Sequence, residues 1–194
     1  SKKLFHEQFP DVIPGLYKRI VDEMLVELNL LNHQNEFTQD NLFCIGLTET
    51  FKELTKGYKP EKHLDLLFQS LCNSTNFEAN EIMEISQRSQ KEFKNKSSKD
   101  ILKLIQDKNN STLYPSRILN LGIYILISNS QDFQEKNKSE INKMISETFE
   151  NLSLSSSKAE KDIGIYKSSI SKMEQAKELI EELKIKDKKK GKEK

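Results

Sequence analysis

The chain has 194 residues, of which 31% are charged and 35% are hydrophobic, and it contains no tryptophan. This length and composition indicate one soluble, helix-rich domain with an appended segment, and they exclude a chain that is disordered throughout. The longest strongly apolar run covers only residues 118–127, whereas a helix that spans a membrane needs about 20 residues. We therefore expect no transmembrane segment.

Charge is distributed unevenly along the chain. Residues 184–194 contain seven lysines and two acidic residues, a net charge of +5, which leaves a net charge of −4 in residues 1–183. Such a basic tail can bind anionic lipid at about 1 kcal/mol per lysine or contact nucleic acid without specificity, and runs of like charge are also commonly disordered and solvated. We predict a basic disordered tail over 186–194, in which Lys188, Lys189 and Lys190 are the candidate lipid-binding residues.

The N-terminal residues and the two cysteines indicate the cellular compartment of the chain. Residues 1–7 lack both the apolar core of a secretory signal and the composition of an organelle transit peptide, so we expect a cytosolic or mature chain, although a leader before Ser1 is left open. Cys44 and Cys72 lie 28 residues apart in apolar contexts without a Cys-x-x-Cys pair. They are expected to be buried free thiols in a reducing compartment.

Apolar residues recur at helical spacing along the whole chain, and no segment alternates long enough to demand a strand. The predicted fold class is all-α, a compact multi-helix bundle over residues 1–152. Helices are expected over 14–32, 40–56, 60–73, 77–93, a short segment capped by Ser98, 115–128, and a weaker segment beginning at Ser139. The helix 115–128 is apolar nearly all round, which favours a position at the centre of the bundle.

The first expected helix has two distinct faces. At 100° per residue, seven residues share one arc and are predicted to be core: Tyr17, Ile20, Val21, Met24, Leu25, Leu28 and Leu31. The opposite stripe mixes charged and apolar residues, and either another helix or a partner protein covers it. Arg19, Glu23 and Glu27 are therefore candidate partner-binding residues, with a solvated helix face as the alternative.

A serine-rich stretch, 153–157, predicts a hinge because serine favours caps over helix interiors. A long amphipathic helix of coiled-coil character is expected from Ser156 to Ile185, roughly 45 Å long at about 1.5 Å per residue. It could pack back on the bundle, engage another protein or pair with a second copy. Its heptad-like seam contains the candidate partner-binding residues Tyr166, Ile170, Met173 and Ile180.

The sequence contains no pattern that is typical of catalysis. No Glu-x-x-His pair, Gly-rich phosphate loop or Gly-x-Ser-x-Gly elbow is present, and the three histidines lack ligand partners at helical spacing. A scattered triad cannot be read from residue order. We predict no enzymatic activity, no catalytic residues, no cofactor and no metal.

Three segments together resemble a known family: 14–31, Leu42–Leu47 leading to Gly57-Tyr58-Lys59-Pro60-Glu61, and Glu160–Lys167. They are similar to the thylakoid formation protein family, also described as a photosystem II biogenesis factor, and matching segments near 14–31, 37–72, 114–126 and 158–176 follow the family's order. Lys18 replaces a common second arginine, which weakens any contact that needs a bidentate guanidinium. The Lys, Asn and Ile richness points to a cyanobacterial version.

The resemblance implies an all-helical fold with a long C-terminal helix and no enzymatic activity. It implies an accessory role in thylakoid membrane biogenesis and photosystem II assembly or repair, peripherally on the cytoplasmic side of the thylakoid membrane. The implied partners are an FtsH-type membrane protease, photosystem II assembly intermediates, or both. The alternative is a peripheral protein that organises thylakoid membranes through lipid contact of its basic tail.

Overall fold

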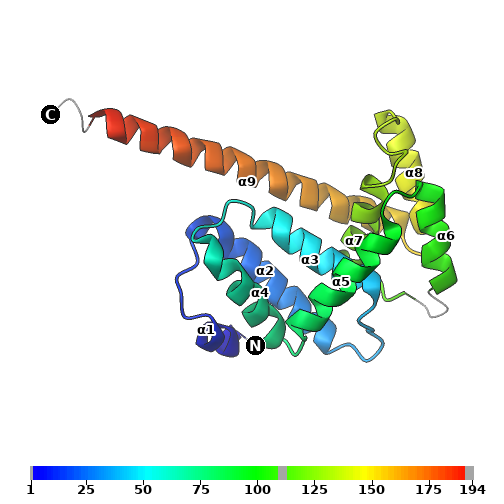
Figure 1. Ribbon diagram of the computed structural model, residues 1–194, viewed down its shortest axis with the longest axis horizontal. Coiled ribbons are helices and arrows are strands. Elements are labelled where there is room, and N and C mark those ends of the chain that lie inside the picture. Colours follow the sequence, from blue (N-terminus) through cyan, green and yellow to red (C-terminus); the bar gives the residue numbers. More distant parts are fainter. Residues whose placement is uncertain (1, 109–112, 191–194) are drawn as a thin grey trace.

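The computed structural model of the chain describes residues 2–108 and 113–190, with side chains described as far as residue 185. Within these ranges the chain forms α-helices and one 3₁₀ turn and no strand, which confirms the all-α prediction (Figure 1). In chain order the elements are α1 (Lys2–Gln8), α2 (Gly15–Asn32), α3 (Asn41–Leu54), η1 (Glu61–His63), α4 (Leu64–Asn73), α5 (Ala79–Phe93), α6 (Ser98–Lys108), α7 (Arg117–Ser128), α8 (Lys138–Asn151) and α9 (Ser156–Lys190).

The centre of the bundle is formed by α3 together with α7. Helix α3 packs against α5 on one side and α7 on another, and both α3 and α7 contact α9. Most residues of α3 and α7 are buried. The predicted central position of the helix near 115–128 is therefore correct, and α3 shares it.

Two glycines allow α3 and α7 to cross with their backbones in contact. A Cβ atom added to Gly46 would overlap the carbonyl oxygen of Ile118, and one added to Gly122 would overlap the carbonyl oxygen of Leu42. No other residue type leaves room for this approach, because every side chain begins with a Cβ atom. Glycine in a helix interior lowers stability by about 1 kcal/mol relative to alanine, but this close packing requires glycine at both positions.

The predicted core face of α2 is confirmed. All seven residues of the expected arc are buried. The start of α3 agrees with the expected range of 40–56, since Asp40 caps the helix by accepting the Phe43 N–H at 2.8 Å. The helix ends at Leu54, two residues before the expected end, and Gly57 follows with a φ of +85°.

The first helix, α1, was not expected from the sequence. It has only seven residues, and it is held by Phe5 and Phe9, which are 2% and 1% exposed. Their rings stack with centroids 6.1 Å apart. A helix this short has little stability of its own, so tertiary burial of these two aromatic rings must maintain it.

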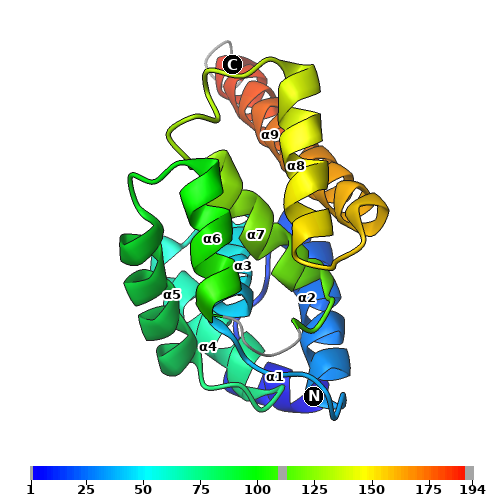
Figure 2. The same cartoon turned by 90° about the vertical axis from the view of Figure 1, so that its right-hand side faces the viewer.

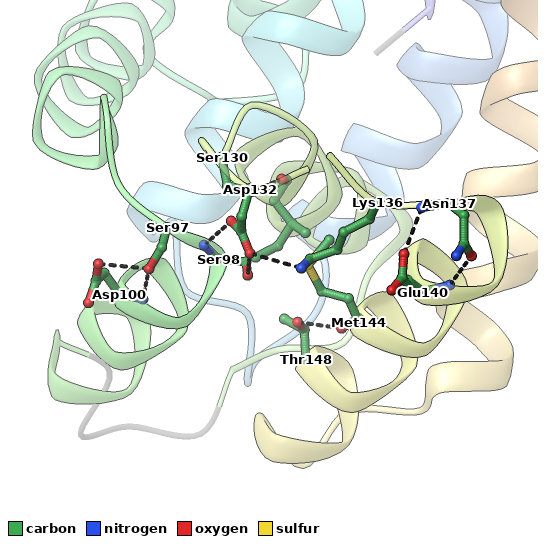
Figure 3. Close-up of polar contacts among 11 residues, drawn as sticks. Ser97, Ser98, Asp100, Ser130, Asp132, Lys136, Asn137, Glu140, Met144 and Thr148 are labelled. Carbon is green, nitrogen blue, oxygen red and sulfur yellow. Dashed lines mark hydrogen bonds and ion pairs between the residues drawn. The ribbon is translucent and has the colours of Figure 1, made fainter. Parts of the chain in front are cut away.

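The corner between α6, α7 and α8 is joined by polar contacts (Figure 3). Asp132, in the loop after α7, accepts hydrogen bonds from the Ser98 backbone N–H at 2.7 Å and from the Ser98 hydroxyl at 2.6 Å. Lys136 pairs with the same carboxylate at 3.6 Å. The loop between α7 and α8 therefore holds the start of α6.

Two helix starts differ from the sequence expectations. The local cap of α6 is Ser97, whose hydroxyl accepts the Asp100 N–H at 3.2 Å, and Ser98 is instead the first helical residue. Helix α8 begins with a capping box in which Asn137 and Glu140 satisfy each other's backbone N–H groups. For α8 the capping box is local, since Asn137 and Glu140 are three residues apart. For α6 the hydroxyl of Ser98 is used in a tertiary contact with Asp132, so the neighbouring Ser97 serves as the local cap.

Helix α9 begins at Ser156, as expected, and continues to Lys190, five residues beyond the predicted end. The described part of the predicted basic tail, 186–190, therefore has a helical backbone. The side chains of Lys188, Lys189 and Lys190 lie outside the described residues. At about 1.5 Å per residue the 35-residue helix is about 52 Å long.

We expect Gly46→Ala to lower the free energy of unfolding by roughly 3 kcal/mol, because the new methyl group forces the α3 and α7 backbones apart. Urea unfolding followed by circular dichroism measures this change. Gly15→Ala is the matched control, since a Cβ atom at Gly15 meets nothing within 4 Å. Equal stability of the two variants would show that the helices do not cross as described.

Asp132 should make stability depend on pH in the acid range. Burial of its carboxyl group tends to raise the pKa, but the hydrogen bonds from Ser98 outweigh it and lower the pKa from 3.8 to about 2. This stabilisation is present above pH 4 and is lost as the pH falls from about 4 to 2.

We therefore expect Asp132→Asn to cost about 1–2 kcal/mol near pH 7 and much less near pH 2. Urea unfolding at a series of pH values measures this difference. A constant difference between the two proteins across that range would contradict the assignment.

Candidate functional site

The first half of α9 is packed on the bundle, and we call residues 156–177 the root of α9. Ala159, Ile163, Tyr166 and Met173 are between 0% and 9% exposed. The root contacts α7, α8 and α3, and Figure 2 shows α8 alongside α9. Burial raises the pKa of the Tyr166 hydroxyl to about 12, so it stays neutral in its place near α7.

Two polar contacts accompany this packing. Asp162 on α9 accepts a hydrogen bond from the Asn120 side chain on α7 at 2.8 Å, and both side chains are buried. Arg117, at the start of α7, pairs with Glu27 on α2 at 2.6 Å. Burial raises the pKa of Glu27 despite the opposing effect of Arg117. Helix α7 thus links α2 and α9 through polar side chains three residues apart.

The second half of α9 extends past the bundle, and we call residues 178–190 the tip of α9 (Figure 1). Every side chain described there, from residue 178 to residue 185, is exposed. Four of them are large and apolar: Leu179 at 58%, Ile180 at 42%, Leu183 at 52% and Ile185 at 51%. Leu179, Ile180 and Leu183 lie within about 100° of one another on the helix, so they form one apolar stripe.

The predicted partner-binding residues of α9 divide between the two halves. Tyr166 and Met173 are buried and Ile170 is half-buried, so their contacts are with the bundle itself. Ile180 is exposed on the tip. Sequence reasoning did not select Leu179, Leu183 and Ile185, because it treated the seam as one continuous face and the pattern of α9 alone does not say where the bundle ends.

The predicted residues on α2 lie on its outer face. Arg19 and Glu23 are exposed and pair with each other at 2.7 Å, while Glu27 is half-buried and held by Arg117. Val26 and Leu30, 60% and 57% exposed, line a shallow groove of about 670 Å³ beside these charges. The stripe opposite the core face of α2 is therefore uncovered by any described helix, and the charged residues on it are partnered locally.

No arrangement for catalysis stands out in the part of the chain that the structure describes. Among those residues no group of three or more His, Cys, Asp or Glu side chains could hold a metal ion. Cys44 and Cys72 are free and buried, and burial raises the pKa of each thiol to about 12. Both therefore stay as thiols near neutral pH, in agreement with the prediction of buried free cysteines.

None of the helices within residues 2–108 and 113–190 combines the length and the apolar composition that crossing a bilayer needs.

Comparison with known proteins decides the family. The profile described as "Thylakoid formation protein" matches residues 1–194. The chain belongs to the thylakoid formation protein family. It is 84% identical over 190 residues to Protein Thf1 of Prochlorococcus marinus (strain MIT 9312), a match that covers 98% of this chain and 94% of the relative.

Two other relatives are less similar in sequence to this chain. Protein Thf1 of Prochlorococcus marinus subsp. pastoris (strain CCMP1986 / NIES-2087 / MED4) is 69% identical over 99% of this chain and 95% of its own length. Protein Thf1 of Synechococcus sp. (strain CC9605) is 38% identical over 94% of this chain and 86% of its own length. These relatives agree with the cyanobacterial origin expected from the sequence.

A solved structure of Psb29 has the same fold. The two structures superpose with a TM-score of 0.84, over 97% of this chain and 95% of that chain, at 23% sequence identity. At this identity the similarity concerns the fold alone. Because the superposition covers 97% of this chain, the shared fold includes both the bundle and the long C-terminal helix.

We expect Asp162→Ala to weaken the attachment of the α9 root, because it leaves the buried Asn120 amide without its partner. The free energy of unfolding should fall by about 1–3 kcal/mol, and amide hydrogen exchange in 159–173 should rise. Lys161→Ala, at an exposed position one residue earlier, is the control and should change neither quantity. Unchanged exchange in the Asp162 variant would rule out this hydrogen bond as an anchor of α9.

Proposed function

We propose that this chain is a non-enzymatic accessory protein of thylakoid biogenesis that works by binding a membrane-protein partner through the tip of α9. One observation carries the proposal: an apolar stripe of three large side chains stays exposed on a helix that extends beyond the bundle. Exposed apolar patches of this kind commonly mark protein interaction sites. The family membership supports the thylakoid context.

The chemistry of the stripe favours a groove-binding mode. Leu179 and Leu183 are four residues apart and Ile180 lies beside them, which is the spacing by which an amphipathic helix inserts into an apolar groove of another protein. Glu178, Glu182 and Lys184 flank the stripe. Charged flanks of both signs restrict which grooves fit, so they contribute specificity more than affinity.

The partner expected from the family resemblance is an FtsH-type membrane protease, with photosystem II assembly intermediates as its clients or as additional partners. In this proposal the protein attaches peripherally to the cytoplasmic side of the thylakoid membrane and supports assembly or repair of photosystem II. The α2 outer face, with Arg19, Glu23 and Glu27, offers a second contact area for the same partner.

The test replaces the apolar side chains of the stripe and leaves the residues of the bundle unchanged. We expect the triple variant Leu179→Ser, Ile180→Ser, Leu183→Ser to recover at least tenfold less FtsH-type protease from solubilised thylakoid membranes than the unchanged chain does. Its urea unfolding should be unchanged, since these side chains are exposed. Ile185→Ser is the matched control, because this residue has the same exposure as Leu183 and lies about 160° from it around the helix.

Equal recovery by all three proteins would refute docking through the tip. Liposome flotation then tests the alternative, in which the +5 charge of residues 184–194 attaches the protein to anionic lipid through Lys188, Lys189 and Lys190. Attachment of that kind is lost between 0.1 M and 1 M salt, as the Debye length falls from about 10 Å to about 3 Å.

A further inference from the structure

Two apolar surfaces of this chain are exposed and do not touch each other. One is the apolar stripe on the tip of α9, formed by Leu179, Ile180 and Leu183. The other is the shallow groove on the outer face of α2, whose apolar floor consists of Val26 and Leu30. The tip belongs to a continuous helix that extends past the bundle (Figure 1), so only the tip of another molecule can enter the α2 groove.

The two surfaces have the same spacing of apolar side chains. Val26 and Leu30 are four residues apart on α2, and Leu179 and Leu183 are four residues apart on the tip. Rows of side chains at this spacing form the ridges that interdigitate when two helices pack. When the tip lies antiparallel to α2 with Leu183 beside Val26, Leu179 lies beside Leu30.

The charges beside the two surfaces select the antiparallel direction. At 100° per residue, Lys184 lies on one side of the stripe and Glu182 on the other. On α2, Glu23 and Glu27 lie together on one side of the apolar floor. Antiparallel packing places Lys184 on the side of these two carboxylates and level with residue 25, midway between them. Parallel packing places Glu182 on that side instead, where like charges oppose each other.

The carboxylate of Glu23 has room for a second cation. Arg19 binds it at Oε1, at 2.7 Å, and an ionised carboxylate accepts hydrogen bonds at both of its oxygens. The two side chains of this pair are 87% and 44% exposed, so the pair contributes little to stability and does not prevent another contact. Glu27, in contrast, is held by Arg117. Lys184 is exposed and forms no ion pair with any residue that the structure describes, so Glu23 is its natural counter-ion.

We propose that the tip of α9 binds in the α2 groove of a second copy of this chain, antiparallel to α2, with Leu179 and Leu183 on the apolar floor and Lys184 at Glu23. The contact involves few side chains compared with a standard protein interface, so the association is weak and reversible. The same stripe binds the partner in the proposed function, and a copy whose stripe is covered cannot bind that partner. This regulatory consequence rests on the proposed function, whereas the self-association does not.

Sedimentation velocity of the full chain over a range of protein concentrations tests the self-association. We expect the unchanged chain to associate as its concentration rises. The tip variant Leu179→Ser, Leu183→Ser and the groove variant Val26→Ser, Leu30→Ser should each self-associate about tenfold more weakly or less. A mixture of the two variants should form a one-to-one complex, because the first supplies an intact groove and the second supplies an intact stripe.

The matched control is the double variant Val12→Ser, Ile185→Ser. It also replaces two exposed apolar side chains, but neither belongs to the stripe or to the groove. It should self-associate as the unchanged chain does. All substituted side chains are exposed, so circular dichroism should show the same helix content in every variant.

Exchange of charges tests the direction of packing and does not depend on the apolar variants. Lys184→Glu and Glu23→Lys should each weaken self-association about threefold, the effect of one exposed ion pair. A mixture of these two variants should associate as strongly as the unchanged chain, because every mixed contact joins opposite charges again. Lys172→Glu, at an exposed position on α9 outside the contact, is the control and should change nothing.

Four results would overturn the proposal. The first is an unchanged chain that stays monomeric at every concentration. The second is self-association of the groove variant, which would indicate pairing of two tips, and the third is self-association of the tip variant, which would indicate pairing of two grooves. The fourth is a mixture of the tip and groove variants that stays monomeric. Should either of these variants fail to fold, the charge exchange decides alone.

A competition experiment separates this inference from the proposed function. An excess of the tip variant, which offers an intact groove, should lower the recovery of FtsH-type protease by the unchanged chain. An excess of a chain that carries both the tip and the groove substitutions should not, and equal recovery with the two competitors would contradict the regulatory consequence. Absence of recovery by the unchanged chain alone would contradict the proposed function, while the self-association would stand on sedimentation.

Discussion

The backbone contact of α3 with α7 at Gly46 and Gly122 is the constraint on which the remaining architecture depends. Because neither helix can move apart or slide without losing this contact, the position of α7 is determined by α3. Helix α7 in turn presents Arg117 to α2 and Asn120 to α9. The attachment of the long helix is therefore decided by a crossing of two other helices in the interior.

Helix α9 divides along its own length into a half that is packed on the bundle and a half whose described side chains are exposed. Its root is held by apolar packing and by Asp162, whereas the described side chains of its tip contribute nothing to the core. Large apolar side chains in water have no stabilising effect on the fold, so the packing of the bundle does not account for Leu179, Ile180 and Leu183.

Several of these features can be predicted from the sequence because their cause is local. The core face of α2 follows from periodicity, and the start of α3 follows from the capping ability of Asp40. Features with a non-local cause cannot be predicted in this way. Helix α1 exists because Phe5 and Phe9 are buried by distant segments, and the division of α9 depends on where its neighbours end. The pocket lined by Phe51, Phe68 and Met83 is likewise assembled from three helices, α3, α4 and α5.

The projecting length of α9 also has an electrostatic consequence. The tip of 13 residues places its end about 20 Å from the bundle at about 1.5 Å per residue. Fields in physiological salt decay over about 8 Å, so a molecule held at the far end is screened from the net charge of −4 on residues 1–183. The projecting length of the helix thus separates its end electrostatically from the body, and an anionic membrane or an acidic protein surface at that end would meet little repulsion from the body.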